Sequence, residues 1–356
     1  MKLELVEHVK VAGEVYGLTL AGNRLLVLRG MAPTLVLDAT SGKLVTELPK
    51  GSTVYAVDAA GALAVVHDDG KTVGGRYEWG SSLWDLAKGK KLASLAKNTP
   101  DDNVTPATFG ATRLLTVRKR KTTYSFRLYD RAGKMVAEHG LGKVLLPFRA
   151  VMSPDERLAA HAYFTGAAHL VDLTTGESRK LAGGALRIGR QHEKGISDLV
   201  FDPAGEHLMY HSGGADAVHV WSVRSRKTLP GKWTTASSSD AFFVGGALVL
   251  VRGRSGEATI TVFALAGKAE PRVIPVGEHA MRFASVGDGR HVACAGATGF
   301  DPAAKASLAV WDVTNGKRAA KGTVPTAMKA VGALAASPAR VALGDRKAGV
   351  ALYAFG

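Results

Sequence analysis

The feature that most restricts the fold of this 356-residue chain is an internal repeat. Each copy contains an apolar strand, an Asp or small residue, a turn that usually holds Gly and a basic residue, and a second strand. The first copy is TLVLDATSGKLVTEL at residues 34–48. The reference residues of the eight copies are Asp38, Asp85, Asp130, Asp172, Ser222, Ala264, Asp312 and Ala354. Their regular spacing predicts a repeat architecture, in which each unit is stable only when it packs against its neighbours.

A second recurring unit precedes each of these copies and consists of a strand, a tight polar turn and another strand. The segment ISDLVFDPAGEHLMY at residues 196–210 is one example, and its turn has the residue types that hairpins prefer. No segment keeps a 3.6-residue apolar period with caps at both ends, so we expect no long helix. Each period therefore carries four short strands, named a to d in chain order.

The eighth copy runs out after its strand c, and the N-terminal segment KLELVEHVK supplies a strand that completes it. We therefore predict an all-β fold, an eight-bladed β-propeller of four-stranded antiparallel blades, closed by the N-terminal strand. Such closure leaves no unpaired edge strand to aggregate. Residues 1–356 are predicted to form a single domain, with the last blade made of residues 323–356 and the strand at 2–10. Seven blades, with one unit as an insertion, is the alternative.

The repeat resembles those of WD40 and YVTN/quinoprotein-like propellers. Trp84-Asp85 and Trp311-Asp312 are WD dipeptides, and His192, Asp216 and Trp221 of the fifth unit stand near the positions that the family uses. The Gly-His dipeptide of the family is absent, so the repeats are of a degenerate kind. The resemblance covers the whole chain and implies a propeller fold, but it implies no particular activity. The abundance of Lys, Ala and Gly suggests a bacterial source.

Composition excludes several other classes of protein. A hydrophobic fraction of 46% can fill a large core. The one cysteine, Cys294, rules out an internal disulfide framework and a multi-cysteine metal site. No apolar run approaches the ~18–20 residues that cross a membrane, and the N-terminus does not read as a signal peptide. We expect a cytoplasmic protein without membrane contact.

The formal charge of +15 suggests acidic partners. In a propeller, the b–c and d–a connections emerge at one end of each blade, which we call the b–c end. Basic residues recur there at the close of strand b: Arg29, His67, Arg118, His161, His211 and Arg252. The connections that follow add Lys119, Arg120, Lys121 and Arg254. The c–d turns at the other end are basic as well, so a solvated turn surface is the alternative interpretation.

Catalytic, metal-binding and cofactor-binding motifs are weak. The His residues form no HxH or HxxxH pair, although His161 and His169 flank one b–c connection and could approach each other. No GxSxG elbow or phosphate loop in its proper setting is present. Cys294 lies in the apolar strand VACA, which favours a buried, inert thiol. We predict no catalytic residue, no metal and no cofactor.

Three connections are longer than the repeat requires, and long loops often carry function. They span residues 68–80, 182–195 and 296–306, all at the b–c end. They and the neighbouring basic residues supply Trp, Tyr, Phe, Ile and Arg side chains of the kind that anchor interfaces. The predicted partner-binding residues are Arg76, Tyr77, Trp79, Arg118, Lys119, Arg120, Lys121, Arg187, Ile188, Arg190, Arg252, Arg254 and Phe300. Alternatively, Trp79 folds back onto its own blade.

The sequence therefore predicts a non-enzymatic scaffold that presents a basic, loop-rich end to an acidic protein or peptide within a larger complex. We expect a monomer or a subunit of a hetero-complex. A propeller enzyme of the lactonase or quinoprotein type is one alternative. Nucleic-acid binding through Arg118–Lys121 is another, although aromatic residues, which stack on bases, make up only 7% of the chain.

Overall fold

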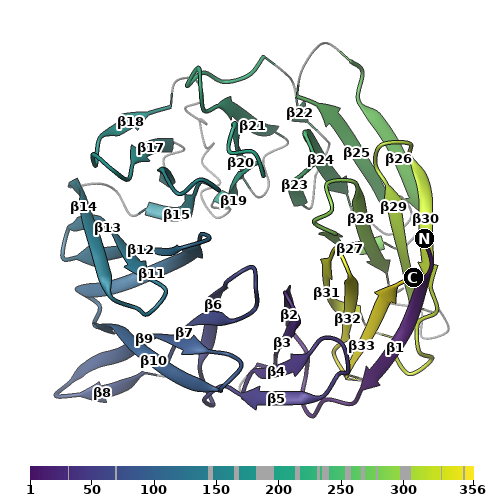
Figure 1. Cartoon of the computed structure of the whole chain (residues 1–356), viewed down its shortest axis with the longest axis horizontal. Coiled ribbons are helices and arrows are strands. Elements are labelled where there is room, and N and C mark those ends of the chain that lie inside the picture. The colour runs from purple at the N-terminus through teal and green to yellow at the C-terminus, as the bar shows by residue number, and fades with distance from the viewer. Residues whose placement is uncertain are drawn as a thin grey trace. The chain divides into compact units, whose positions relative to one another are not determined.

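The computed structural model describes residues 1–356 except for 31, 69, 143–146, 164–167, 182–195, 213–216, 231–232, 235–239, 253–257, 266–268, 278–279, 297–305, 330 and 348. Of helices and strands, only β-strands are present in this part of the chain (Figure 1). No described helix is long and apolar enough to span a membrane. The chain divides into two compact units, which are residues 1–50 with 235–356 and residues 51–234.

The first unit contains four antiparallel sheets of four strands. Blade one consists of β2 (Gly17–Ala21), β3 (Arg24–Leu28), β4 (Leu35–Asp38) and β5 (Leu44–Glu47). Blade six consists of β23 (Asp240–Val244), β24 (Ala247–Arg252), β25 (Ala258–Ala264) and β26 (Arg272–Gly277). Blade seven consists of β27 (Ala280–Ser285), β28 (His291–Gly296), β29 (Ser307–Asp312) and β30 (Lys317–Gly322). Blade eight consists of β31 (Val331–Ser337), β32 (Arg340–Asp345), β33 (Gly349–Phe355) and β1 (Leu3–Val9).

The second unit contains the other four sheets. Blade two consists of β6 (Thr53–Val57), β7 (Leu63–His67), β9 (Arg76–Asp85) and β10 (Lys90–Asn98), with the short β8 (Lys71–Val73) added to β9. Blade three consists of β11 (Asp102–Phe109), β12 (Arg113–Arg120), β13 (Thr123–Asp130) and β14 (Met135–Gly142). Blade four consists of β15 (Pro147–Met152), β16 (Leu158–Tyr163), β17 (Ala168–Asp172) and β18 (Ser178–Lys180). Blade five consists of β19 (Ile196–Phe201), β20 (His207–Ser212), β21 (Ala217–Ser222) and β22 (Trp233–Thr234).

Eight four-stranded antiparallel blades confirm the predicted all-β, eight-bladed propeller and exclude the seven-bladed alternative. Two predictions of detail were wrong. Residues 68–80 are not simply a loop, because β8 pairs with the first half of an extended β9 around a turn at Gly74 and Gly75. Strand d of blade five lies at Trp233–Thr234 rather than at the end of the repeat copy VHVWSVRSRKTL (218–229), whose residues 227–229 make an isolated bridge and two backbone hydrogen bonds to strand c.

The N-terminal strand completes blade eight as the repeat predicted. The order of that sheet is β1-β33-β32-β31, and the two chain ends lie together in Figure 1. The amide of Gly356 donates to the carbonyl of Lys2 over 3.0 Å, which extends the ladder to the last residue. Leu3 of β1 is buried in a core cluster with Val310, Ala320 and Tyr353. The pairing therefore satisfies the backbone of β33 and covers apolar side chains of two blades.

The c–d turns explain why Asp and Gly recur in the repeat. Asp312 accepts the amide of Thr314 through its side chain, and Asp172 accepts those of Thr174 and Thr175. This local bonding holds the chain in a turn in place of a continued strand. The glycine that follows has a positive φ of 59° to 84° in five blades, where a Cβ would be strained: Gly42, Gly89, Gly133, Gly176 and Gly316. In blade five the equivalent residue is Arg226, with φ 58°.

Strand b lies between strands a and c and is buried on both sides. Each residue of β7 and of β28 is buried. The core of each unit consists of clusters that run from one blade to the next, such as the one that joins Leu199 and Trp221 of blade five to Ala160 and Leu170 of blade four. The strands therefore fix the scaffold, and the connections at both ends remain free to vary.

Replacing Leu3 by Ala should lower the free energy of unfolding by about 2–4 kcal/mol, because it leaves a cavity between blades seven and eight. Leu5 lies on the same strand but is 45% exposed, so Leu5→Ala should change stability by less than about 0.5 kcal/mol. Urea denaturation of the two variants checks this prediction. Equal losses would contradict the role of β1 as a core strand.

Candidate functional site

The basic residues at the ends of the b strands differ in how far their side chains are buried and bonded within the protein. Arg29 is only 8% exposed. Its Nε donates to the carbonyl of Pro33 over 2.8 Å and its Nη1 to the carbonyl of Ala12 over 3.0 Å, while Nη2 lies 3.6 Å from Glu47. The guanidinium therefore ties together the connections around blade one. It adds little to a field that would attract a partner.

Two of the histidines in this series are buried. His161 is 1% exposed, stacks on His169 with ring centroids 5.2 Å apart, and meets the edge of Phe126. Burial, with a smaller contribution from the charge of His169, lowers the pKa of His161 to about 3. The ring of His67 lies 3.9 Å from that of Tyr55, tilted by 36°, and burial lowers the pKa of His67 to about 4. Both rings are neutral at pH 7, so the expected positive charge at these positions is absent.

The basic cluster of blade three is divided between strand and turn. We expected Lys119 and Arg120 in a loop, but β12 continues through both. Arg118 makes a bidentate pair with Asp102 of the neighbouring strand, and the Nζ of Lys119 donates to the carbonyl of Pro100 over 3.0 Å. Arg120 and Lys121 are exposed, and Lys121 holds a positive φ of 53° in the turn. Arg120 and Lys121 are the exposed cations of this cluster.

The hairpin of β8 and β9 is the most distinctive feature of blade two. The residues of β9 that precede Ser81 do not pair with β7, and residues 76–78 pair with β8 instead. Tyr77 is 49% exposed, and its ring lies 5.7 Å from that of Trp79, two residues further along the same face of the strand. The ring of Tyr77 covers Gly70, where any Cβ would collide with it. The hairpin therefore displays two adjacent aromatic rings.

A cavity of about 400 Å³ lies beside Trp79. Trp79 and Gly80 form one wall, and strand β10 contributes Ser94 and Ala96. Five charged side chains line it: Asp68, Lys71, Glu78, Lys91 and Lys97. Glu78 pairs with Lys97 over 2.8 Å, and Asp68 lies 3.8 Å from Lys91. Lys71 is then the cation of this lining that has no acidic partner among the described lining residues. The side chain of Trp79 is half-buried and lies partly against its own blade.

A buried amide joins blade two to blade three behind this cavity. Asn98 is fully buried; its Nδ2 donates to the Oγ of Ser81 over 2.6 Å, and its Oδ1 accepts the amide of Val104 over 2.9 Å. The hairpin and the basic cluster thus stand at the same end of two neighbouring sheets. We did not predict Asn98 or Tyr55, since an Asn at the end of a strand and a Tyr in an apolar strand give no specific signal.

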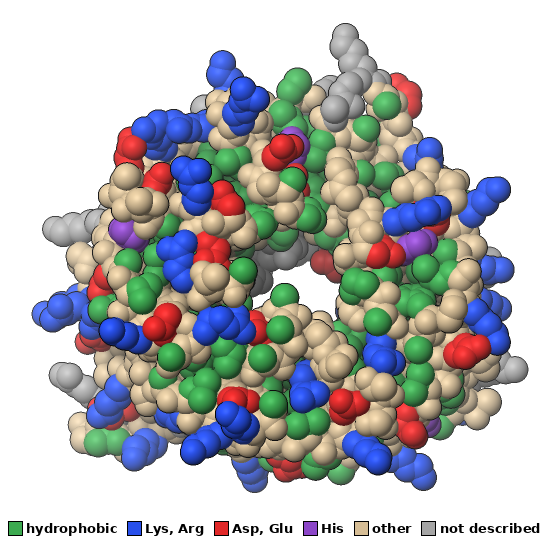
Figure 2. All heavy atoms as spheres, viewed as in Figure 1, with side chains coloured by type: hydrophobic (Ala, Val, Ile, Leu, Met, Phe, Trp, Pro, Cys, Tyr) green, Lys and Arg blue, Asp and Glu red, His purple; other side chains and the backbone are tan. Residues whose placement is uncertain are grey.

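The other predicted anchors belong to the first unit or have no described side chain. Arg252 closes β24 in the first unit and is half-buried. Only the backbone of Arg76 is described, within β9. Five anchors fall outside the described residues: Arg187, Ile188, Arg190, Arg254 and Phe300. Figure 2 shows Lys and Arg interspersed with Asp and Glu over the face in view.

The described residues contain no group of three or more His, Cys, Asp or Glu side chains able to hold a metal ion. Cys294 is buried as predicted, and burial raises the pKa of its thiol to about 12, so it is protonated at neutral pH. The site is therefore described best as a surface of aromatic rings and paired charges.

Comparison with solved structures supports the fold. The chain is similar to the C-terminal WD40 domain of Sif2, with a TM-score of 0.65 and 14% identity over 99% of this chain and 98% of that one. It is similar to the β-propeller domain of Cps50 (Swd1) from Myceliophteria thermophila, with a TM-score of 0.56 and 13% identity over 99% of each chain. It is also similar to the computationally designed Ika8 protein, with a TM-score of 0.62 and 15% identity over 99% of each chain. No family model and no curated protein matches the sequence. The fold is thus that of WD40-like β-propellers, and such low identity shows the fold alone.

The buried histidines make stability depend on pH. Because the unfolded chain binds a proton on His161 below pH 6.5 and the folded chain does so only near pH 3, the free energy of unfolding should fall as the pH falls between these values. The loss from this residue should reach at most about 1.4 kcal/mol per pH unit. His161→Leu should flatten the profile measured by urea denaturation at pH 7, 5.5 and 4.5.

Phe126→Leu is the matched control, because it disturbs the same packing without removing a titratable group. It should lower stability by a similar amount at each pH. A profile for His161→Leu as steep as that of the unaltered protein would show that His161 does not stay neutral in the folded chain.

Proposed function

We propose that this protein is a non-enzymatic interaction scaffold that binds an acidic segment of a protein partner at the b–c end of blades two and three. The observation that carries the proposal is the β8–β9 hairpin, which extends strand c beyond its blade and displays Tyr77 beside Trp79. A propeller needs no such extension to complete a four-stranded sheet. An exposed Tyr77 beside a half-buried Trp79 has a cost in solubility that a binding role would explain.

The chemistry of the surface favours an acidic partner. Tyr and Trp bury a large area with few rotatable bonds, which makes them common anchors of interfaces. Lys71 beside the rings, with Arg120 and Lys121 on the next blade, would steer acidic residues toward them. The paired charges of the cavity, Glu78 with Lys97 above all, would form a polar rim.

The fold supports a scaffold in a general way, since it presents connections of any sequence on rigid sheets. We infer a cytoplasmic protein that acts as a monomer or as a subunit of a hetero-complex. A chain with one buried cysteine suits a reducing compartment.

Replacement of both aromatic anchors by Ala should weaken partner binding. We expect Tyr77→Ala with Trp79→Ala to weaken binding at least about tenfold, which is ~1.4 kcal/mol or more, because the rings supply the apolar area at the centre of the contact. The measurement is affinity purification from the native host, followed by titration of synthetic peptides that tile the recovered partner.

Tyr16→Ala is the control, since Tyr16 is 57% exposed and belongs to the other unit. It should leave binding unchanged. Binding that survives loss of Tyr77 and Trp79, or a partner segment that is basic, would refute the proposal. Salt-dependent binding of single-stranded nucleic acid at these rings would favour the nucleic-acid alternative.

A further inference from the structure

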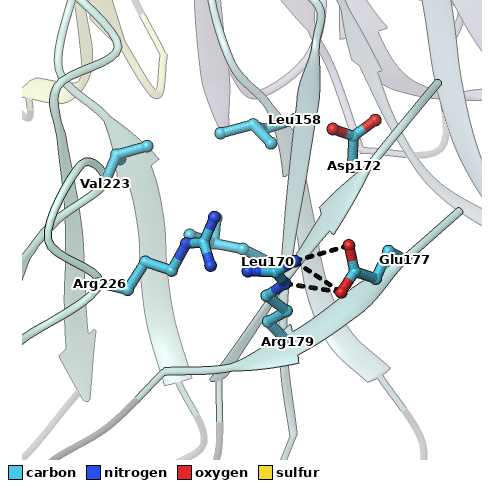
Figure 3. Close-up of a pocket in the computed structure, with 7 residues that line it drawn as sticks. All are labelled: Leu158, Leu170, Asp172, Glu177, Arg179, Val223 and Arg226. Carbon is cyan, nitrogen blue, oxygen red and sulfur yellow. Dashed lines mark hydrogen bonds and ion pairs between the residues drawn. The ribbon is translucent and has the colours of Figure 1, made fainter. Parts of the chain in front are cut away.

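A second cavity opens at the opposite end of the second unit, between the c–d turns of blades four and five. Its volume is about 140 Å³. Leu158 and Leu170 of blade four and Val223 of blade five form an apolar floor, which continues the core cluster between the two blades to the surface. Arg179 and Arg226 stand at the rim with their guanidinium groups directed into it (Figure 3).

The two acidic residues of this cavity already have hydrogen-bond donors of their own. Glu177 accepts two hydrogen bonds from Arg179, at 2.8 Å and 2.7 Å, and this pairing lowers the pKa of Glu177. Asp172 turns its carboxylate to the backbone amides of its own turn, which lowers its pKa in the same direction. Arg226, in contrast, makes no side-chain hydrogen bond or ion pair with any described residue. It lies close enough to Glu177 to influence that carboxylate.

Other pairs of neighbouring blades are joined by an ion pair or a hydrogen bond at this end. Arg131 of blade three pairs with Asp58 of blade two, and Glu156 of blade four accepts the side chain of Arg113 of blade three. In the first unit, Arg272 of blade six donates to the carbonyl of Val313 of blade seven. At the seam between blades four and five the corresponding place is the cavity, with Arg226 at its rim. The arginine is present, but no carboxylate of the described residues forms an ion pair with it.

The backbone of Arg226 is a second, independent observation. It occupies the left-handed position that glycine takes in five other c–d turns, where a residue with a Cβ is strained. A glycine here would relieve the strain and still allow the turn. Strained positions of this kind concentrate where a side chain has a task that outweighs its cost.

We propose that this cavity binds the side chain of a glutamate presented by a protein partner. Arg226 receives the carboxylate in a bidentate pair, Arg179 adds positive charge from the other wall, and the methylene groups lie on Leu158, Leu170 and Val223. An inorganic phosphate would gain nothing from this apolar floor. The site lies at the other end of the blades from Tyr77 and Trp79, so it does not depend on the function proposed for them.

Chemical modification of arginine tests the site directly. Phenylglyoxal should modify Arg226 rapidly in the full-length protein, and the peptide Ac-Ala-Glu-Ala-NH2 should slow that reaction roughly threefold or more, because the carboxylate covers the guanidinium. Peptide mapping by mass spectrometry reports each arginine separately. Ac-Ala-Gln-Ala-NH2 should give no protection. If phosphate or free glutarate protected Arg226 and the glutamate peptide did not, the ligand would not be a glutamate side chain of a protein, and the proposal would be wrong.

The variant Arg226→Gly separates binding from folding. It should raise the midpoint of thermal unfolding by about 1–2 °C, because it removes the strained Cβ, and it should abolish the response to the glutamate peptide. Arg224, exposed on the same turn but outside the cavity, is the matched control, and Arg224→Gly should keep the protection at Arg226. A less stable Arg226→Gly protein, or protection of Arg224 equal to that of Arg226, would contradict the proposal.

Discussion

The structure depends on the burial of the inner strands of the blades against neighbouring blades of the same unit. Strand b is apolar on both faces, as β7 and β28 show, and no four-stranded sheet can cover both faces by itself. Packing between successive sheets supplies the cover, in clusters such as the one between blades four and five. The pairing of β1 with β33 follows from the same need, since Leu3 adds to the core of blades seven and eight.

This division between core and turn decides which charged residues can act on a partner. Many cations that the sequence places at blade ends serve the fold: Arg29 binds backbone carbonyls, Arg118 binds Asp102, and Arg131 binds Asp58. The net charge of +15 is therefore a poor guide to a binding surface. The informative residues are those that the fold does not need, namely the aromatic pair of the β8–β9 hairpin and Arg226.

The repeat was enough to predict the fold class, the number of blades and the role of the N-terminal strand, because alternation, turn residues and period all point to one solution. The site was predicted only in part. Tyr77 and Trp79 stood out by residue type, but the hairpin that presents them was missed because a Gly74-Gly75 turn between short polar strands looks like a loop. The pair of Arg118 with Asp102 could not be foreseen, since their contact depends on the register between β11 and β12. Arg226 carries no sequence signal until its φ is known.

Site-specific photocrosslinking in the native host tests the central claim most directly. A photoreactive phenylalanine analogue at position 77 should form a covalent adduct with a protein, and the crosslinked peptide of that protein should be acidic. The same analogue at position 16, an equally exposed tyrosine of the other unit, should form none. No adduct at position 77, or the same adducts from both positions, would contradict the account of blade two as a docking surface.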